Sequence, residues 1–356
     1  MEFDNTTLLA MVRSALWMFY FIFGICIIFF NSKKEQYKYI LGTLLLLWSF
    51  DFIKDAVSQY CLLLSSDYIR HLYLLFDIIA IPLCAFYLLT MTYKHWLTLS
   101  RAVLSFLPFL CGFFAYMFLP SQRMFLVALI AVPMLYAFFM VPYILRGLRR
   151  YSKAIDDNYS YRDRIDIQWL KTVVWLLVVN LVFCIFLYSH ISMLYLMIYY
   201  LYSMGMWLYI IIRDYKYERP KWIPEPDPDS CAGKQEEPKE PCRCNQACGS
   251  LAGRLEKYFT DERVFLKSDL TVQNVAVELG TNRTYLSQCL NHELNTTFFD
   301  YVNGFRLEHA CNLLKTTDMN IMNIAEESGF EYFSSFYRVF KKAYGCTPKE
   351  YREANR

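Results

Sequence analysis

Two short stretches near the C-terminal end of the chain combine hydroxyl, amide and basic side chains at helical spacing. Arginine suits the guanine edge and glutamine the adenine edge, while lysine and arginine also neutralise phosphates. The sequence therefore predicts a surface that contacts nucleic acid. The candidate residues are Arg283, Thr284, Ser287 and Gln288 in the first stretch, and Ser334, Ser335, Arg338, Lys341 and Lys342 in the second.

The two stretches suit two kinds of contact. We expect Arg283, Lys341 and Lys342 to bind phosphates, and the other six residues to read base edges. Each side chain taken alone is equally consistent with a solvated surface position. Whether these side chains contact DNA therefore depends on the helices that carry them.

The first stretch is predicted to lie on the second helix of a helix-turn-helix unit. Thr271 is placed to cap a helix over residues 272–279, Gly280 makes the turn, and Asn282 caps the next helix over residues 283–292. Apolar positions recur at helical spacing. The residues expected to point inward are Val272, Val275, Ala276, Leu279, Tyr285, Leu286, Cys289 and Leu290.

The second stretch repeats this design. Asn320 caps a predicted helix over residues 321–327, Gly329 makes the turn, and a helix over residues 331–343 ends at Gly345. Thr347 and Pro348 begin a last short helix. The residues expected to point inward are Ile321, Ile324, Ala325, Phe333, Phe336, Val339, Phe340 and Tyr344.

One long helix over residues 298–315 is predicted between the two units, with Gly304 in its middle at a cost of about 1 kcal/mol relative to alanine. At 1.5 Å per residue it would separate the two recognition helices by roughly 30 Å, about one turn of DNA. The two helices would then enter successive major grooves. A lead-in helix over residues 251–264 is expected before the first unit.

These residues resemble the DNA-binding domain of the AraC/XylS family, which has two helix-turn-helix units joined by a linker helix. The resemblance covers about the last quarter of the chain and implies a transcription regulator, usually an activator that contacts RNA polymerase. Phe333 and Ser335 depart from the residues usual at their positions, so base preference does not transfer. The matching residues include Ala276, Leu279, Gly280, Leu286, Arg306, Ala310, Gly329, Phe330, Phe336, Arg338, Phe340, Gly345, Pro348 and Arg352.

The rest of the chain is unusually apolar. Hydrophobic residues make up 56% of the 356 residues, and charged residues are concentrated in the last third. The long apolar stretches are residues 8–30, 39–64, 72–91, 102–119, 124–145 and 172–212. The last stretch would be about 62 Å long as one helix, twice the bilayer core, so it is expected to fold back at Ser189 and His190. The sequence predicts seven spans.

Basic residues predict the orientation of these spans. With the N-terminus outside, the inner loops hold most of the lysines and arginines between spans, and the outer loops hold only Arg70 and Arg123. This orientation puts the C-terminal domain in the cytoplasm, where it can reach DNA. We therefore expect a multi-pass protein of the cytoplasmic (inner) membrane.

Four ionisable residues fall inside the second and third predicted spans: Asp51, Lys54, Asp55 and Asp77. Charges in a bilayer are costly and usually face partners or water. One interpretation is a site that senses an unidentified signal ligand or ion. The other is a structural polar clamp between two helices.

Residues 214–249 are rich in proline and cysteine and are expected to form a semi-rigid spacer. Four thiolates could hold zinc in a tetrahedral site. The C-x-C spacing is not the usual zinc pair, so loop cysteines without a metal are the alternative. The four residues are Cys231, Cys242, Cys244 and Cys248. No cofactor is expected.

The sequence thus predicts an all-α protein. A seven-helix transmembrane sensor domain (1–213) and the Pro/Cys-rich linker (214–249) precede an all-helical double helix-turn-helix domain (250–356). Its predicted function is membrane-anchored, sequence-specific transcription regulation, with double-stranded DNA, the lipid bilayer and a second copy of the chain as partners. No residue pattern indicates catalysis. The alternatives are a transporter or channel with a regulatory DNA-binding tail, and a membrane scaffold whose helix-turn-helix units bind protein.

Overall fold

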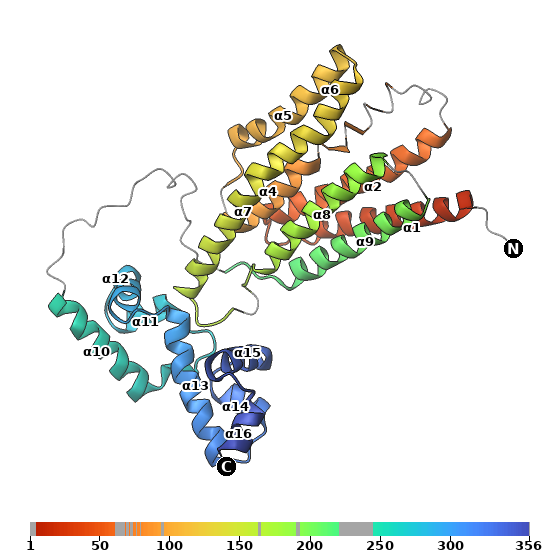
Figure 1. Cartoon of the computed structure of the whole chain (residues 1–356). Helices are drawn as coiled ribbons and strands as arrows, with labels where there is room; N and C mark the ends of the chain where they lie inside the picture. The colour runs from red at the N-terminus through yellow and green to blue at the C-terminus, as the bar shows by residue number, and fades with distance from the viewer. Residues whose placement is uncertain are drawn as a thin grey trace. The chain divides into compact units, whose positions relative to one another are not determined.

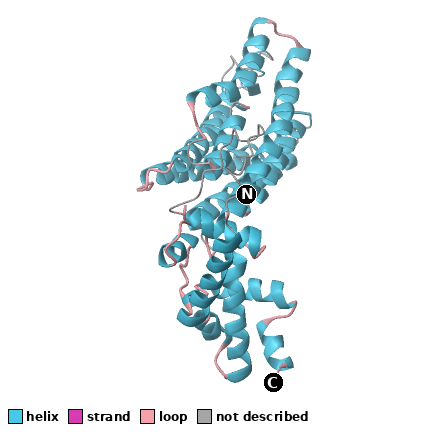
Figure 2. Ribbon diagram, turned by 90° about the vertical axis from the view of Figure 1, so that its left-hand side faces the viewer, coloured by secondary structure: helices cyan, strands magenta, loops and turns pink. Residues whose placement is uncertain are grey.

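The computed structural model describes residues 5–60, 68, 71, 74–75, 77–78, 80–93, 96–162, 165–189, 193–220 and 245–355. Within these ranges the backbone is helical, with helices joined by loops and no named strand (Figure 2). The chain divides into two compact units. The first consists of Met1–Arg149 and Gln168–Tyr215, and the second of Arg150–Ile167 and Lys216–Arg356.

The first unit consists of long apolar helices (Figure 1). Their bounds are α1 (Asn5–Phe29), α2 (Gln36–Tyr60), α4 (Ala80–Thr92), α5 (Leu99–Phe118), α6 (Gln122–Leu126), the π-helix η2 (Val127–Ala131), α7 (Val132–Asp156), α8 (Trp169–Ser189) and α9 (Met193–Lys216). The last turns of α7, from Arg150 onward, belong to the second unit.

Among the described residues, four helices are long and apolar enough to cross a membrane: Leu8–Phe29, Leu99–Phe118, Gln122–Asp156 and Leu194–Lys216. They coincide with four of the seven predicted spans. Helix α2 is not among them, and its sequence contains Lys38, Asp51, Lys54 and Asp55. The other three spans stay predictions.

Small residues and buried hydroxyls hold the first unit together. A Cβ atom added to Gly42 on α2 would lie 2.9 Å from the Gly24 carbonyl oxygen on α1, so glycine lets these two backbones approach closely. The Tyr20 and Ser203 hydroxyls are 3.0 Å apart and join α1 to α9. Large apolar side chains such as Phe138 on α7 and Phe118 on α5 remain exposed.

The second unit contains the predicted double helix-turn-helix arrangement. Its helices are α10 (Asn245–Glu262), the 3-10 helix η3 (Val264–Leu266), α11 (Val272–Glu278), α12 (Arg283–Gln288), the π-helix η4 (Cys289–Glu293), α13 (Phe298–Thr316), α14 (Ile321–Glu327), α15 (Phe333–Tyr344) and α16 (Pro348–Ala354). The predicted caps Thr271, Asn282 and Asn320 are confirmed, because each side chain accepts a hydrogen bond from the first turn of its helix.

Helix α13 is shared by two apolar cores. Phe298 and Val302, near its start, pack into a core formed with α10, η3, α11 and α12. Leu307 and Leu314 pack into a second core formed with α14 and α15. A single rigid helix therefore carries both helix-turn-helix units, as the sequence predicts.

Candidate nucleic-acid interface

Helix α12 presents the first set of predicted contacts. Asn282 caps it and Gly280, at φ +61°, makes the turn that precedes it. Leu286 is fully buried and holds the helix on the first core. On the outer face Thr284 and Gln288 are exposed, and Arg283 and Ser287 are half-buried.

Helix α15 presents the second set. Phe336 and Phe340 are fully buried, and their rings lie 5.5 Å apart in the second core. The α15 side chains predicted to contact DNA are on the opposite side. Ser334, Arg338, Lys341 and Lys342 are exposed, and Ser335 is half-buried.

Three aromatic residues depart from the expected burial. The prediction that Tyr285, Phe333 and Tyr344 are buried is wrong, because they are 51%, 41% and 43% exposed. Each lies near the end of a short helix, where helical spacing places a side chain at the edge of the apolar face rather than in its centre. Phe333 therefore adds an apolar side chain to the exposed surface of α15.

The turn before α15 lies against the backbone of η3. Gly329 has φ +83°, and a Cβ atom there would lie 2.6 Å from the Phe265 carbonyl oxygen and 2.8 Å from that of Leu266. Only glycine tolerates both the left-handed backbone and this approach. The second helix-turn-helix unit is thereby fixed to the segment that leads into the first.

Arg306, on α13, is a buried structural anchor rather than a DNA contact. Its guanidinium donates to the Phe265 carbonyl oxygen at 2.7 Å and to the Lys267 carbonyl oxygen at 2.6 Å. Burial lowers the pKa of Arg306 to about 10, so it stays charged at neutral pH. A buried guanidinium needs such acceptors, and here they join the linker helix to η3 and to the residue that follows it.

The electrostatics of the outer faces favour an anionic partner. The Lys342 ammonium is 4.0 Å from Asp300 in an exposed pair, which contributes little to stability. Partial burial lowers the pKa of Arg283, but an arginine remains protonated at neutral pH. Both outer faces therefore offer cationic groups beside hydroxyl groups, and α12 adds an amide.

Comparison with known proteins agrees with this geometry. Residues 275–354 match the family described as "Helix-turn-helix domain". The "Uncharacterized HTH-type transcriptional regulator YtdP" of Bacillus subtilis (strain 168) is 37% identical over 90 residues, which are 25% of this chain and 12% of that protein. The "Xylose operon regulatory protein" of Escherichia coli (strain K12) is 36% identical over 86 residues, 24% of this chain and 22% of that protein.

The C-terminal part of the chain is an AraC-family helix-turn-helix domain. The "Melibiose operon regulatory protein" of Escherichia coli (strain K12) is also similar, at 33% identity over 24% of this chain and 28% of that protein. A solved structure, "The C-terminal domain of AraT, a response regulator from Geobacillus stearothermophilus", is 35% identical over 29% of this chain and 84% of that chain, with a TM-score of 0.28. The chain spans only 12%, 22% and 28% of the three regulatory proteins above.

The predicted sensing residues are placed only in part. Asp51, on α2, and Asp77 are both half-buried. The side chains of Lys54 and Asp55 lie outside the described residues, so the four-residue cluster stays a prediction. No group of three or more metal-binding side chains occurs in the described ranges. Cys231, Cys242, Cys244 and the side chain of Cys248 lie outside those ranges.

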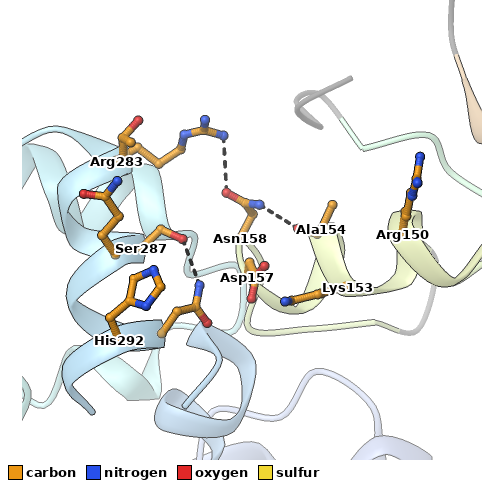
Figure 3. A pocket seen from close by; sticks show the side chains of 11 residues that line it. Arg150, Lys153, Ala154, Asp157, Asn158, Arg283, Ser287 and His292 are labelled. Atoms are coloured by element: carbon orange, nitrogen blue, oxygen red, sulfur yellow. Dashed lines mark hydrogen bonds between the residues drawn. The ribbon is translucent and has the colours of Figure 1, made fainter. Parts of the chain in front are cut away.

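The sequence gives no indication of the cavity that lies beside α12. Arg150–Ile167 belongs to the same unit as the C-terminal helices. The end of α7 and the residues after it face α12 across a cavity of about 320 Å³ (Figure 3). Asn158 and Ser160 lie between the predicted spans at residues 124–145 and 172–212. The cavity is lined by Arg150, Lys153, Ala154, Asp157, Asn158, Arg283, Thr284, Ser287, Gln288, Asn291 and His292.

Proposed function

We propose that the chain is a membrane-anchored, sequence-specific transcription regulator, and that it acts as an activator. The observation that carries this proposal is the double helix-turn-helix arrangement on one linker helix, in a chain whose described residues also include four helices apolar enough to cross a membrane. The N-terminal helices would cross the cytoplasmic membrane seven times, with the N-terminus outside. The C-terminal domain would then reach the chromosome.

In the proposed complex, α12 and α15 enter successive major grooves. Thr284, Ser287 and Gln288 would read bases from α12, while Ser334, Ser335 and Arg338 would read bases from α15. Arg283, Lys341 and Lys342 would bind phosphates. The exposed polar faces of both helices support these roles, and the exposed Phe333 ring has the chemistry to contact a thymine methyl group.

The remaining partners follow from the same proposal. AraC/XylS-type activators contact RNA polymerase, and two tethered copies of the chain would gain affinity through effective concentration.

The signal would act on the region of Asp51, Lys54, Asp55 and Asp77. We expect Asp51→Asn or Asp77→Asn to change signal-dependent transcription at unchanged protein level, and a normal response of both variants would make these residues structural.

Genome-wide mapping of DNA bound by the full chain tests the proposed function. We expect discrete promoter sites that disappear in a Gln288→Ala/Arg338→Ala variant, because the two substitutions together remove one base-reading side chain from each unit. Gln273→Ala is the matched control, since Gln273 is an exposed glutamine on α11, outside the recognition helices. Enrichment at no discrete site, or the same sites in the double variant, would favour a scaffold that binds protein instead.

A further inference from the structure

The segment after α7 is joined to the first helix-turn-helix unit through its backbone. Tyr159 and Thr271 form an antiparallel bridge. The Val272 N–H donates to the Asn158 carbonyl oxygen at 3.0 Å, and the Ser160 N–H donates to the Leu270 carbonyl oxygen at 3.2 Å. These bonds place the segment directly beside the start of α11.

Ser160 forms a second attachment, on α13. Its carbonyl oxygen accepts from the Arg306 guanidinium at 3.2 Å and from the Asn303 amide at 3.4 Å. Its hydroxyl lies 3.3 Å from another Arg306 nitrogen and donates to the Leu270 carbonyl oxygen at 2.7 Å. Ser160 and Arg306 are each 1% exposed. The segment thus supplies acceptors to the buried cation that organises the DNA-binding domain.

Side chains of the same segment cover α12. The Arg283 guanidinium donates to the Asn158 side-chain oxygen at 3.4 Å (Figure 3). Asp157 on this segment and Asn291, which follows α12, both line the same cavity. Arg283, which is predicted to bind a DNA phosphate, therefore donates a hydrogen bond to another part of the same chain.

The cavity beside α12 has protein on both sides. One wall contains the proposed base-reading residues Thr284, Ser287 and Gln288, and the other contains Arg150 and Lys153 at the end of α7. A recognition helix must enter a groove about 12 Å wide and bring its side chains within hydrogen-bond distance of the bases. A hollow of about 320 Å³ cannot hold a duplex. DNA would have to displace the segment to reach this face.

We propose that residues 150–162 are an intramolecular clamp that competes with DNA for the first recognition helix. This inference rests on the proposed function and specifies its regulation. On α15 the corresponding side chains Ser334, Arg338, Lys341 and Lys342 are exposed. With the clamp docked, the chain binds DNA through the second unit alone; with the clamp released, both units bind.

The position of the clamp in the chain identifies what releases it. Residues 150–156 are the last turns of α7, and the segment continues to Trp169 at the start of α8. A signal that displaces the ends of these two apolar helices pulls directly on the Tyr159–Thr271 bridge. The signal thereby reaches α12 without passing through the linker at residues 214–249.

A disulfide across the bridge tests the clamp. The hydrogen bonds on both sides of Tyr159 and Thr271 make them a non-hydrogen-bonded pair, whose Cα atoms lie about 4.5 Å apart, within the range that a disulfide spans. The full-length Tyr159→Cys/Thr271→Cys chain in lipid nanodiscs is titrated with a duplex recovered by the genome-wide mapping, before and after oxidation. Each single-cysteine variant, oxidised in the same way, controls for the other cysteines.

We expect oxidation to weaken binding of the double variant by about a hundredfold, the low end of the gain from a second linked module, and reduction to restore it. Binding to a duplex that carries only the second half-site should not change, which shows that the locked domain is folded. Asn158→Ala removes the side-chain acceptor of Arg283 while leaving the backbone bonds of the bridge, and it should tighten binding of the otherwise native chain. Equal binding of the oxidised and reduced double variant would overturn the clamp alone. Absence of binding by the reduced native chain would overturn the proposed function, and the clamp with it.

Discussion

Gly329 offers a sharp test of how the two helix-turn-helix units are held together. The change is Gly329→Ala. Alanine at φ +83° costs about 1–2 kcal/mol, because the left-handed backbone places its Cβ atom too close to a carbonyl oxygen. The Cβ atom would also lie 2.6 Å and 2.8 Å from the carbonyl oxygens of Phe265 and Leu266. These are backbone atoms that cannot rotate away, and overpacking of this kind costs about 1–3 kcal/mol.

The expected loss in the free energy of unfolding is therefore about 2–5 kcal/mol. Gly345→Ala is the matched control, because Gly345 has φ +72° and nothing within 4 Å of an added Cβ atom. It should lose only the backbone cost of about 1–2 kcal/mol. Pulse proteolysis in urea measures both variants in the full-length chain. Equal losses for the two variants would refute the close approach of the second turn to η3.

Further predictions concern the linker helix, the second core and the last cap. Gly304→Ala should raise the stability of the C-terminal domain by about 1 kcal/mol, because Gly304 is inside α13 with open space around it; a lower urea midpoint would contradict this. Phe336→Ala should lower stability by about 3–5 kcal/mol, since the ring is fully buried; a loss below that of Gly345→Ala would show that the second core is not formed around it. The Thr347 N–H donates to the Glu350 carboxylate and lowers the pKa of Glu350. The charged carboxylate therefore stabilises the fold above its ordinary pKa, and this contribution is lost as the pH falls through the lowered pKa. Glu350→Gln should remove this part of the pH dependence, as measured by thermal melts across the acidic range.

The helices, caps and turns of the C-terminal domain can be predicted from the sequence, because interactions between residues close together in the chain determine them. Apolar residues at helical spacing, such as Leu286 and Phe336, mark the faces that are buried. Asn282 and Asn320 stand where a helix needs a side-chain acceptor, and Gly280 and Gly329 stand where the turn needs a positive φ. These signals act within a few residues, so the sequence alone locates them.

The features that the sequence did not reveal depend on long-range contacts. Tyr285 and Phe333 have the same spacing as core residues, but the core ends beside them. Arg306 carries no signal that it is buried, because its acceptors come from the distant residues Phe265 and Ser160. The docking of residues 150–162 on α11 and α13 follows from no pattern within that segment.

We propose that one chain joins apolar membrane-spanning helices to a DNA-binding domain in the cytoplasm. Its most direct test is to crosslink living cells, separate the membrane fraction, purify the chain by a C-terminal tag and sequence the attached DNA. We expect discrete promoter fragments attached to the full-length chain in the membrane fraction. Promoter DNA recovered only with a shorter soluble fragment of the chain would contradict it.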